Sequence, residues 1–232
     1  MAISPPRYAL IVAAGQGTRA RPAGEVSSTP KQFAWLAGKP VLRYSIEAFA
    51  SSFPDIRFIL VLPGVYPDFV QDLPTIFAPH PFTLITGGET RFHSVKNGLA
   101  AVQEPDAMVF VHDAARPLLT PALIQRCYAV AVEHGTAVPV VPATESLRVV
   151  DAEGRNHPLD RHTVKCMQTP QTFRAALLLE AFRQPYDPQF TDEATVVEKA
   201  GHTIQLVEGE PTNIKLTYPH DFEIAALLLA KR

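Results

Sequence analysis

Five short and almost continuously apolar runs, separated by segments with helical periodicity, constrain the fold of this chain more than any other feature. Each run is rich in β-branched and aromatic residues, and such uniform hydrophobicity is typical of strands buried on both faces of a mainly parallel sheet. The pattern predicts strands at 8–14, 57–62, 82–86, 107–112 and 136–141. It also predicts helices at 40–49, 92–102 and 120–133, the last with Thr120 as N-cap and Pro121 at the first helical position.

The alternation of strands and helices predicts an α/β fold, a doubly wound three-layer sandwich with a mainly parallel sheet. In such folds the ligand site lies in the crevice beyond the carboxyl ends of the strands. Further helices are expected at 175–182, 192–200 and about 219–230, and a further strand at 203–207. A length of 232 residues with 47% hydrophobic residues fits one domain over 1–232 with a single sizeable core.

One segment interrupts the alternation of strands and helices. A polar turn at 151–156 (DAEGRN) separates the apolar run 147–150 from a second short run that ends near Leu159. We expect an arm at about 142–165 that leaves the sheet. A two-stranded arm cannot bury both of its faces alone, so a second subunit is the expected cover, and the chain is expected to form a homodimer.

Composition excludes several classes of partner. The 21 Lys and Arg residues are balanced by 23 Asp and Glu residues, so the chain lacks the basic excess of a nucleic-acid binder, and any anion site must be local. The two cysteines, Cys127 and Cys166, form no zinc-binding pattern and suit a reducing cytoplasm. The apolar runs are shorter than the ~20 residues of a membrane helix, and no signal peptide is recognisable. We therefore expect a cytoplasmic protein without nucleic-acid or membrane partners.

A glycine loop, AAGQGTR at 13–19, follows the first expected strand. Glycines let backbone N–H groups converge on an anion, so Ala13, Ala14, Gly15 and Gly17 are candidates for lining a phosphate. The glycines alone are equally consistent with an ordinary tight turn between a strand and a helix. A dinucleotide-binding oxidoreductase is disfavoured because no acid follows the second strand, and a Walker P-loop is absent.

Two cations flank this loop, Arg19 within it and Lys31 in Pro-Lys-Gln at 30–32. In a chain of near-neutral charge such a pair suits a triphosphate, because Arg binds outer phosphates as a fork and Lys acts as a point charge. The combination resembles the signature of nucleotidyltransferases that activate sugars and polyols with a nucleoside triphosphate.

Five further blocks occur in order: GGETRFHSVKNGL at 87–99, HDAARP at 112–117, QTPQTF at 168–173, TDEA at 191–194 and EGEPTNIK at 208–215. Together with the glycine loop they resemble the 2-C-methyl-D-erythritol 4-phosphate cytidylyltransferase family of the non-mevalonate isoprenoid pathway, over roughly residues 8–228. The resemblance implies a Rossmann-like nucleotidyltransferase fold with a β-arm used in dimerisation. It also implies transfer of CMP from CTP to methylerythritol phosphate with Mg²⁺, releasing pyrophosphate.

The resemblance assigns roles to the nucleotide half of the site. Arg19 would hold the β and γ phosphates, while Lys31, with Lys215 on the other side, would stabilise charge at the α-phosphorus. Gly88, Glu89 and Ser94 would read the base, since cytosine presents a donor beside acceptors. The neighbouring Arg91 and Lys96 are interpreted as a solvated helix face.

Acceptor binding is assigned to a second group. Asp113 would hold Mg²⁺ or a substrate hydroxyl, and Arg116 would pair with Asp113 or with substrate; the alternative is a purely structural Asp113–Arg116 ion pair. His112 is expected to be a buried, hydrogen-bonded residue rather than a catalyst. The resemblance places the polyol phosphate on Ser146, Arg161 and Thr169, with the arm reaching across a two-fold dimer.

Thr191 is a weaker site candidate. Its simpler interpretation is the N-cap of a helix whose first turn carries two acids, Asp192 and Glu193.

The chain departs from the family pattern at two places. Residues 20–29 make a longer loop than is usual, and Glu145-Ser146 stands where Asp-Thr is common, with Arg148 keeping a nearby cation. The second departure keeps ribitol 5-phosphate open as an alternative acceptor. A catalytically degenerate nucleotide-binding module is the alternative from another class. Retention of Arg19, Lys31, Asp113 and Lys215 argues against it.

Overall fold

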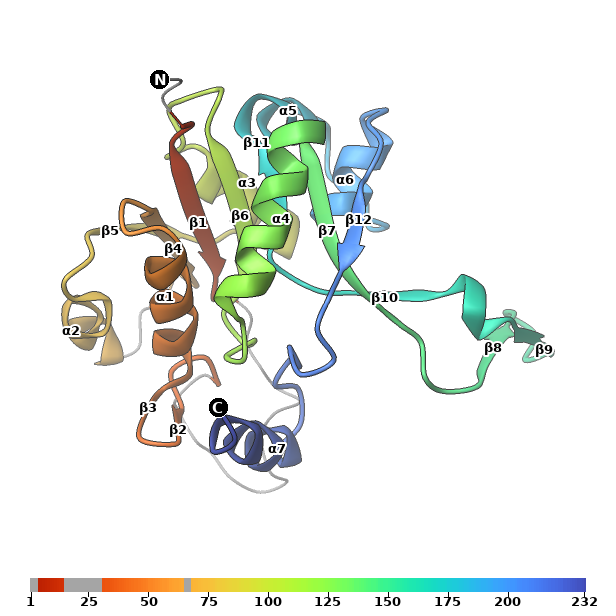
Figure 1. Ribbon diagram of the computed structural model, residues 1–232. Helices are drawn as coiled ribbons and strands as arrows, with labels where there is room; N and C mark the ends of the chain where they lie inside the picture. The colour runs from red at the N-terminus through yellow and green to blue at the C-terminus, as the bar shows by residue number, and fades with distance from the viewer. Residues whose placement is uncertain (1–3, 15–30, 65–67) are drawn as a thin grey trace.

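The computed structural model describes residues 4–14, 31–64 and 68–232, and its centre is a mixed, mainly parallel sheet (Figure 1). The strands run in the order β10-β7-β11-β6-β1-β4-β5, and β12 pairs with β7. Their bounds are β1 Arg7–Val12, β4 Arg57–Leu62, β5 Phe82–Thr86, β6 Met108–Asp113, β7 Thr136–Pro142, β10 Lys165–Met167, β11 Gln171–Arg174 and β12 Leu206–Glu208.

The four strands at the middle and one edge of the sheet are parallel. In the register, Leu10 of β1 lies opposite Ile59 of β4 on one side and Val111 of β6 on the other. Strand β12 also runs parallel to its partner β7. By contrast, β11 lies antiparallel between β6 and β7, and β10 pairs antiparallel with β7.

Helices cover both faces of the sheet, giving the expected three layers (Figure 1). Alternate residues of each strand point to opposite faces, so Ala9 and Ile11 of β1 join one apolar cluster and Tyr8 and Leu10 join the other. The first cluster is shared with α1 Val41–Ser52, α2 Leu73–Phe77 and α4 Pro121–His134. The second is shared with α3 Arg91–Leu99, α5 Ala175–Ala181 and α6 Glu193–Lys199.

A smaller cluster lies beyond the carboxyl ends of the strands. There α7 His220–Leu229 packs near the short hairpin of β2 Trp35–Leu36 and β3 Lys39–Pro40, and Leu36, Leu216 and Ala225 are buried together (Figure 1). A 3₁₀ helix, η2 at Asp68–Asp72, precedes α2. Within the described ranges, no helix has the length and apolar character needed to cross a bilayer.

The sequence-based boundaries agree closely with the structure in the parallel part of the sheet. The strands at 57–62 and 82–86 are confirmed to the residue, and Thr120 caps α4 by accepting a hydrogen bond from the Leu123 amide at 3.1 Å. Helix α4 ends at Gly135, whose φ of 85° is the left-handed conformation that favours glycine at a helix C-terminus. The antiparallel strand β11 was not predicted, and the strand expected at 203–207 lies instead at Leu206–Glu208.

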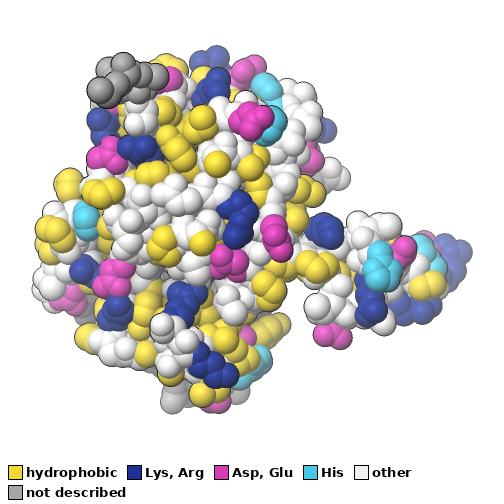
Figure 2. All heavy atoms as spheres, viewed as in Figure 1, with side chains coloured by type: hydrophobic (Ala, Val, Ile, Leu, Met, Phe, Trp, Pro, Cys, Tyr) yellow, Lys and Arg dark blue, Asp and Glu magenta, His cyan; other side chains and the backbone are white. Residues whose placement is uncertain are grey.

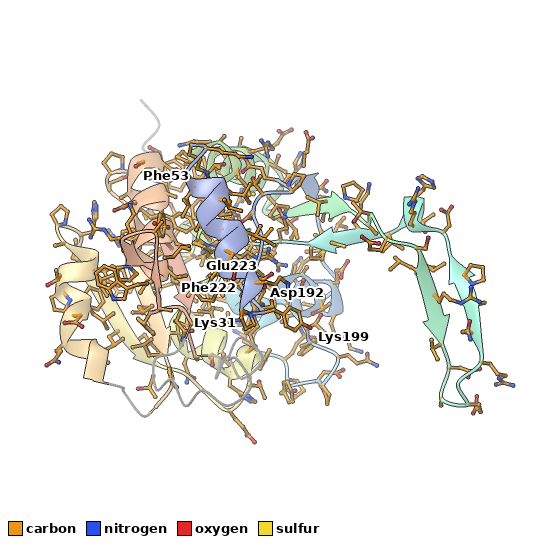
Figure 3. All side chains as sticks on the ribbon, turned by 90° about the horizontal axis from the view of Figure 1, so that it is seen from below. Lys31, Phe53, Asp192, Lys199, Phe222 and Glu223 are labelled. Carbon is orange, nitrogen blue, oxygen red and sulfur yellow. The ribbon has the colours of Figure 1, made fainter. Side chains whose placement is uncertain are left out.

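The expected arm is confirmed as an excursion from the sheet (Figures 1 and 3). Among the described strands, β8 Leu147–Val150 and β9 Asn156–Leu159 pair only with each other, and the 3₁₀ helix η3 Arg161–Thr163 leads back to the sheet. The turn uses Gly154 at a φ of 80°. Every residue from 148 to 163 is exposed, so the described residues of one chain cover neither face of the arm.

Candidate active site

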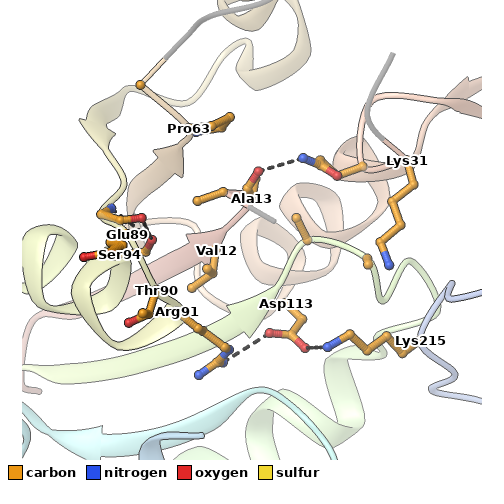
Figure 4. A pocket seen from close by; sticks show the side chains of 16 residues that line it. Val12, Ala13, Lys31, Pro63, Glu89, Thr90, Arg91, Ser94, Asp113 and Lys215 are labelled. Carbon is orange, nitrogen blue, oxygen red and sulfur yellow. Dashed lines mark hydrogen bonds and ion pairs between the residues drawn. The ribbon is translucent and has the colours of Figure 1, made fainter. Parts of the chain in front are cut away.

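A pocket of about 610 Å³ lies at the carboxyl ends of β1, β4 and β6, against the N-terminus of α3 (Figure 4). This is the edge at which an open α/β sheet binds its ligands. The predicted site residues that line it are Ala13, Ala14, Lys31, Gly88, Glu89, Ser94, Asp113 and Lys215. Gln32 and Arg91 also line it and were not predicted.

Asp113, the last residue of β6, is the centre of a charge network on the pocket wall. Its Oδ2 accepts from Lys215 Nζ at 2.7 Å, and its Oδ1 accepts from Arg91 Nη2 at 3.1 Å (Figure 4). Burial opposes ionisation of this carboxyl, but the cations of Arg91 and Lys215 outweigh burial and hold the pKa of Asp113 well below its usual value. Asp113 is therefore a carboxylate held between two cations.

Arg91 also reaches a second acid, Glu193 in the first turn of α6. The guanidinium donates to both oxygens of this carboxylate, from Nη1 to Oε1 and from Nη2 to Oε2 at 2.9 Å. The interpretation of Arg91 as a solvated cation was wrong, because it packs between two acids from other elements. Lys96, five residues further along α3, is exposed as expected.

Lys31 and Gln32 are fixed to the pocket by two short hydrogen bonds. Lys31 Nζ donates to the carbonyl of Leu216 at 2.6 Å, next to Lys215, and Gln32 Nε2 donates to the carbonyl of Ala13 at 2.6 Å. The two candidate lysines thus approach the pocket from two distant segments of the chain. Gly15, Gly17 and Arg19 lie outside the described residues.

The loop between β5 and α3 forms the opposite wall. The backbone N–H of Gly88 donates to Ser94 Oγ at 3.1 Å, and Thr90 caps α3 through the amide of His93. At Gly87 a Cβ would lie 2.8 Å from Ala14 Cβ and 3.0 Å from the Leu62 carbonyl, so a side chain would force this loop away from β1 and β4. The glycine therefore permits the close approach that brings Gly88, Glu89 and Ser94 into the pocket.

Two candidates from neighbouring motifs lie behind the pocket wall rather than in its lining. Arg116 donates to the carbonyls of Asn213 at 2.7 Å and Met167 at 3.4 Å, so the alternative of an Asp113–Arg116 ion pair is wrong. Thr169 is buried; its hydroxyl accepts from the Asp113 amide and bonds to His112 Nδ1, both at 3.1 Å. His112 is confirmed as a buried, hydrogen-bonded residue, and burial lowers its pKa to about 4.

The remaining candidates are exposed. Ser146 and Arg161 lie on the arm, where Arg161 Nη1 donates to the carbonyl of Thr144 at 3.1 Å, and neither lines the pocket. Thr191 precedes α6 but does not cap it, and that interpretation was wrong. Asp192 is the N-cap and forms a capping box with Thr195. In it, the Asp192 carboxylate accepts a hydrogen bond from the Thr195 amide at 2.9 Å.

The pocket lining offers carboxylates to a magnesium ion that is carried by phosphates. Among residues 4–14, 31–64 and 68–232, no group of three or more His, Cys, Asp or Glu side chains is arranged to hold a metal ion. Asp113 and Glu89 supply carboxylates to the lining. Mg²⁺ is commonly bound by one or two carboxylates together with substrate phosphates, so these residues fit it.

The chain is similar to known proteins at the level of family, sequence and structure. The family model described as IspD, 2-C-methyl-D-erythritol 4-phosphate cytidylyltransferase, matches residues 8–231. The enzyme of that name from Bacteroides thetaiotaomicron is 44% identical, with 95% of this chain and 98% of the relative covered. The enzyme of the same name from Porphyromonas gingivalis is 43% identical over 96% of this chain and 97% of its own.

Solved structures agree. The crystal structure of 2-C-methyl-D-erythritol 4-phosphate cytidylyltransferase from Thermus thermophilus is 32% identical, with a TM-score of 0.75 over 96% of this chain and 98% of its own. A crystal structure of 4-diphosphocytidyl-2C-methyl-D-erythritol synthase is 29% identical, with a TM-score of 0.81 over 98% of this chain and all of its own. Taken with the pocket, these matches over nearly the whole length establish that the chain belongs to the 2-C-methyl-D-erythritol 4-phosphate cytidylyltransferase family.

Proposed function

We propose that this protein transfers CMP from CTP to 2-C-methyl-D-erythritol 4-phosphate in isoprenoid precursor synthesis. A phosphate oxygen of the acceptor attacks the α-phosphorus in line, and the bond from that phosphorus to the bridging β-phosphate oxygen breaks. The products are 4-diphosphocytidyl-2-C-methyl-D-erythritol and pyrophosphate. The observation that carries the proposal is the convergence of Lys31, Lys215 and Asp113 on one pocket at the carboxyl edge of the sheet.

Positioning and positive charge supply most of the catalysis in such a reaction. Lys31 Nζ and Lys215 Nζ are held by the Leu216 carbonyl and by Asp113, respectively, so both ammonium groups are oriented before substrate enters. Donors fixed in advance stabilise charge that develops in the transition state without a reorganisation cost. We assign Lys31 as the principal cation, Lys215 as the second, and Arg19 as the ligand of the outer phosphates.

The wall formed by Gly88, Glu89 and Ser94 is proposed to read cytosine. Backbone carbonyls of this loop can accept from the exocyclic amino group, and backbone N–H groups or the Ser94 hydroxyl can donate to N3 and O2. Uracil presents a donor at N3 and an acceptor at C4, so the same arrangement discriminates against UTP.

Asp113 would be the protein ligand of a Mg²⁺ ion bound to the phosphates of CTP, and such an ion would neutralise phosphate charge. Asp113 already bonds two cations, so the phosphates would supply most of the coordination. The free state of Cys127 and Cys166 agrees with a reducing, cytoplasmic location, which we also propose.

A homodimer is proposed to complete the acceptor site. The arm projects away from the sheet (Figures 1 and 3). Ser146 and Arg161, which belong to this arm, are exposed and do not line the pocket. In a two-fold dimer, Arg161 of the partner subunit would bind the polyol phosphate as a fork. Thr169, Arg116 and Thr191 are retained as candidates near this half of the site.

The experiment that tests the function is a matrix of pyrophosphate release. The four nucleoside triphosphates, each with Mg²⁺, are combined with methylerythritol phosphate and with ribitol 5-phosphate. CTP with methylerythritol phosphate is expected to turn over far faster than any other pair. Equal rates with UTP would overturn the assignment of the base-reading loop. Faster turnover of ribitol 5-phosphate would transfer the assignment to that acceptor, and no turnover with any pair would support a degenerate module.

A further inference from the structure

Four charged side chains of alternating sign form a row from α6 to the pocket. Glu193 bonds to Arg91, Arg91 to Asp113, and Asp113 to Lys215. Of these four residues, only Asp113 and Lys215 have roles in the proposed reaction. Glu193 is 1% exposed and lies outside the pocket lining, while Arg91 lines the pocket and joins the two acids.

The placement of Glu193 is not explained by the needs of α6. The N-terminus of this helix is already capped by Asp192 and Thr195. The other buried residues of α6 are apolar, Ala194, Val196 and Val197. Burying a carboxylate among them carries a large desolvation cost, and an ion pair of this kind is weak grounds for stability by itself.

The first turn of α6 is instead held in place by hydrogen bonds to β11. Gln171 of β11 accepts from the Ala194 amide at 2.9 Å and donates to Asp192 Oδ2 at 2.8 Å. Glu193 lies between these two anchored residues, so its carboxylate has little freedom to move. It meets the Arg91 guanidinium as a fork, the geometry that specifies orientation as well as charge.

The fork limits what Arg91 can do at Asp113. Arg91 Nη2 is shared between Glu193 Oε2 at 2.9 Å and Asp113 Oδ1 at 3.1 Å. The other oxygen of Asp113 stays with Lys215 at 2.7 Å. If Glu193 lost its charge, Arg91 would bind Asp113 more strongly and from a shifted position. The ion pair between Lys215 and Asp113 would then weaken.

We propose that Glu193 is a positioning residue that acts through Arg91 to orient Asp113 and Lys215 toward the acceptor half of the reaction. The proposal rests on the proposed function, because it takes Asp113 and Lys215 as groups that contact the reacting substrates. Glu193 itself touches neither substrate.

The test compares Glu193→Gln with Glu198→Gln, the same chemical change at an exposed position of the same helix. Rates are measured well below the melting temperature of the least stable variant, so that all proteins are folded. Glu193→Gln is expected to lower kcat/KM for the polyol phosphate by about tenfold to a hundredfold, the scale of a small misplacement of catalytic groups. KM for CTP is expected to change less than threefold, and Glu198→Gln is expected to match the wild type.

A double-mutant cycle identifies the route. Arg91→Gln should lower kcat/KM, and adding Glu193→Gln to it should change kcat/KM by less than twofold, because Glu193 acts through Arg91. The same addition should raise the melting temperature, because it removes an unpaired buried charge. Additive losses of activity, or a loss spread equally over both substrates, would overturn the proposal.

Two further measurements keep the outcome decisive. If Glu193→Gln does not fold, Arg91→Lys replaces it, since lysine keeps the charge but cannot join both acids as a fork; unchanged kcat/KM would then overturn the proposal. Crystal structures of the wild type and Glu193→Gln report on positioning without any turnover. A Lys215–Asp113 contact unchanged from 2.7 Å would contradict the proposal even if the enzyme used another acceptor.

Discussion

The pocket and the arm hold their polar residues in opposite ways. At the pocket, the Asp113 side chain is 12% exposed and is fixed by cations from two other segments of the chain. On the arm, Arg161 is exposed and donates to a backbone carbonyl only seventeen positions away. Figure 2 shows the arm as a separate projection with Lys, Arg and His side chains gathered on it.

This difference distinguishes the pocket, which one chain assembles by itself, from the arm, whose polar residues remain exposed on a single chain. Long-range packing of the sheet assembles the pocket and its charge network, where residues 102 positions apart form ion pairs. The candidate residues on the arm, Ser146 and Arg161, are not among the described residues that line the pocket. The comparison supports an acceptor site shared between subunits, and it can be tested from either region.

The largest expected effect is at the pocket. Lys31→Ala should lower kcat by roughly 10²–10³, the scale for loss of one preorganised electrostatic donor, with a smaller effect on CTP binding. Steady-state kinetics measure both. The matched control is Lys199→Ala, an exposed lysine of α6, which should leave kcat unchanged (Figure 3). An unaltered kcat for Lys31→Ala would show that Lys215 is the principal cation.

The second prediction contrasts a histidine of the sheet with one of the arm. His112 is buried and its pKa is lowered from 6.5 to about 4, so the unfolded chain takes up this proton first as pH falls. The stabilising effect of the neutral ring is complete above pH 6.5 and is lost toward pH 4. Between pH 7 and pH 4 this one group should remove roughly 3 kcal/mol from the free energy of unfolding.

Urea unfolding across this pH range measures the effect in wild type, His112→Gln and His157→Gln. His112→Gln should show a shallower pH dependence by that amount. His157 lies exposed on β9, so His157→Gln should follow the wild type. Parallel curves for wild type and His112→Gln would rule out His112 as the source.

The same division explains what the sequence could predict. Strands buried on both faces give continuous apolar runs, so β4 and β5 were located to the residue. Thr120 and Pro121 carry a local capping signal that needs no tertiary information. The pocket residues Lys31, Asp113 and Lys215 were found from motifs, and the structure brings them together.

What escaped prediction depends on partners distant in sequence or on a choice between neighbours. Strand β11 is only four residues long and its antiparallel pairing is set by how the arm returns to the sheet. Arg91 resembles any helix-surface cation until Glu193, 102 residues away, is placed beside it. Thr191 and Asp192 are both good capping residues, and only the backbone conformation selects Asp192.

The third prediction tests the arm directly. Arg161→Ala and Lys31→Ala subunits, each nearly inactive alone, should regain activity when mixed and allowed to exchange. With random exchange at equal amounts, half of the dimers are mixed and each has one intact site of two, so about a quarter of wild-type activity should return. Exchange is verified by mass spectrometry. Activity equal to the sum of the two variants would mean that each site is built within one chain.

The smallest expected effect lies at the arm tip and is measured against an arginine of the sheet. Arg155 pairs with Asp151 and Glu153, both at 2.8 Å, but its side chain is 76% exposed. Exposed pairs of this kind contribute little, so Arg155→Ala should change the free energy of unfolding by less than about 0.5 kcal/mol.

Arg7 pairs with Asp55 at 2.6 Å, its side chain is 12% exposed, and it stacks over the Phe53 ring at 4.7 Å. Arg7→Ala should therefore remove about 2 kcal/mol. Urea unfolding of both variants makes the comparison, and equal losses would show that the arm tip is buried in solution against something other than its own chain.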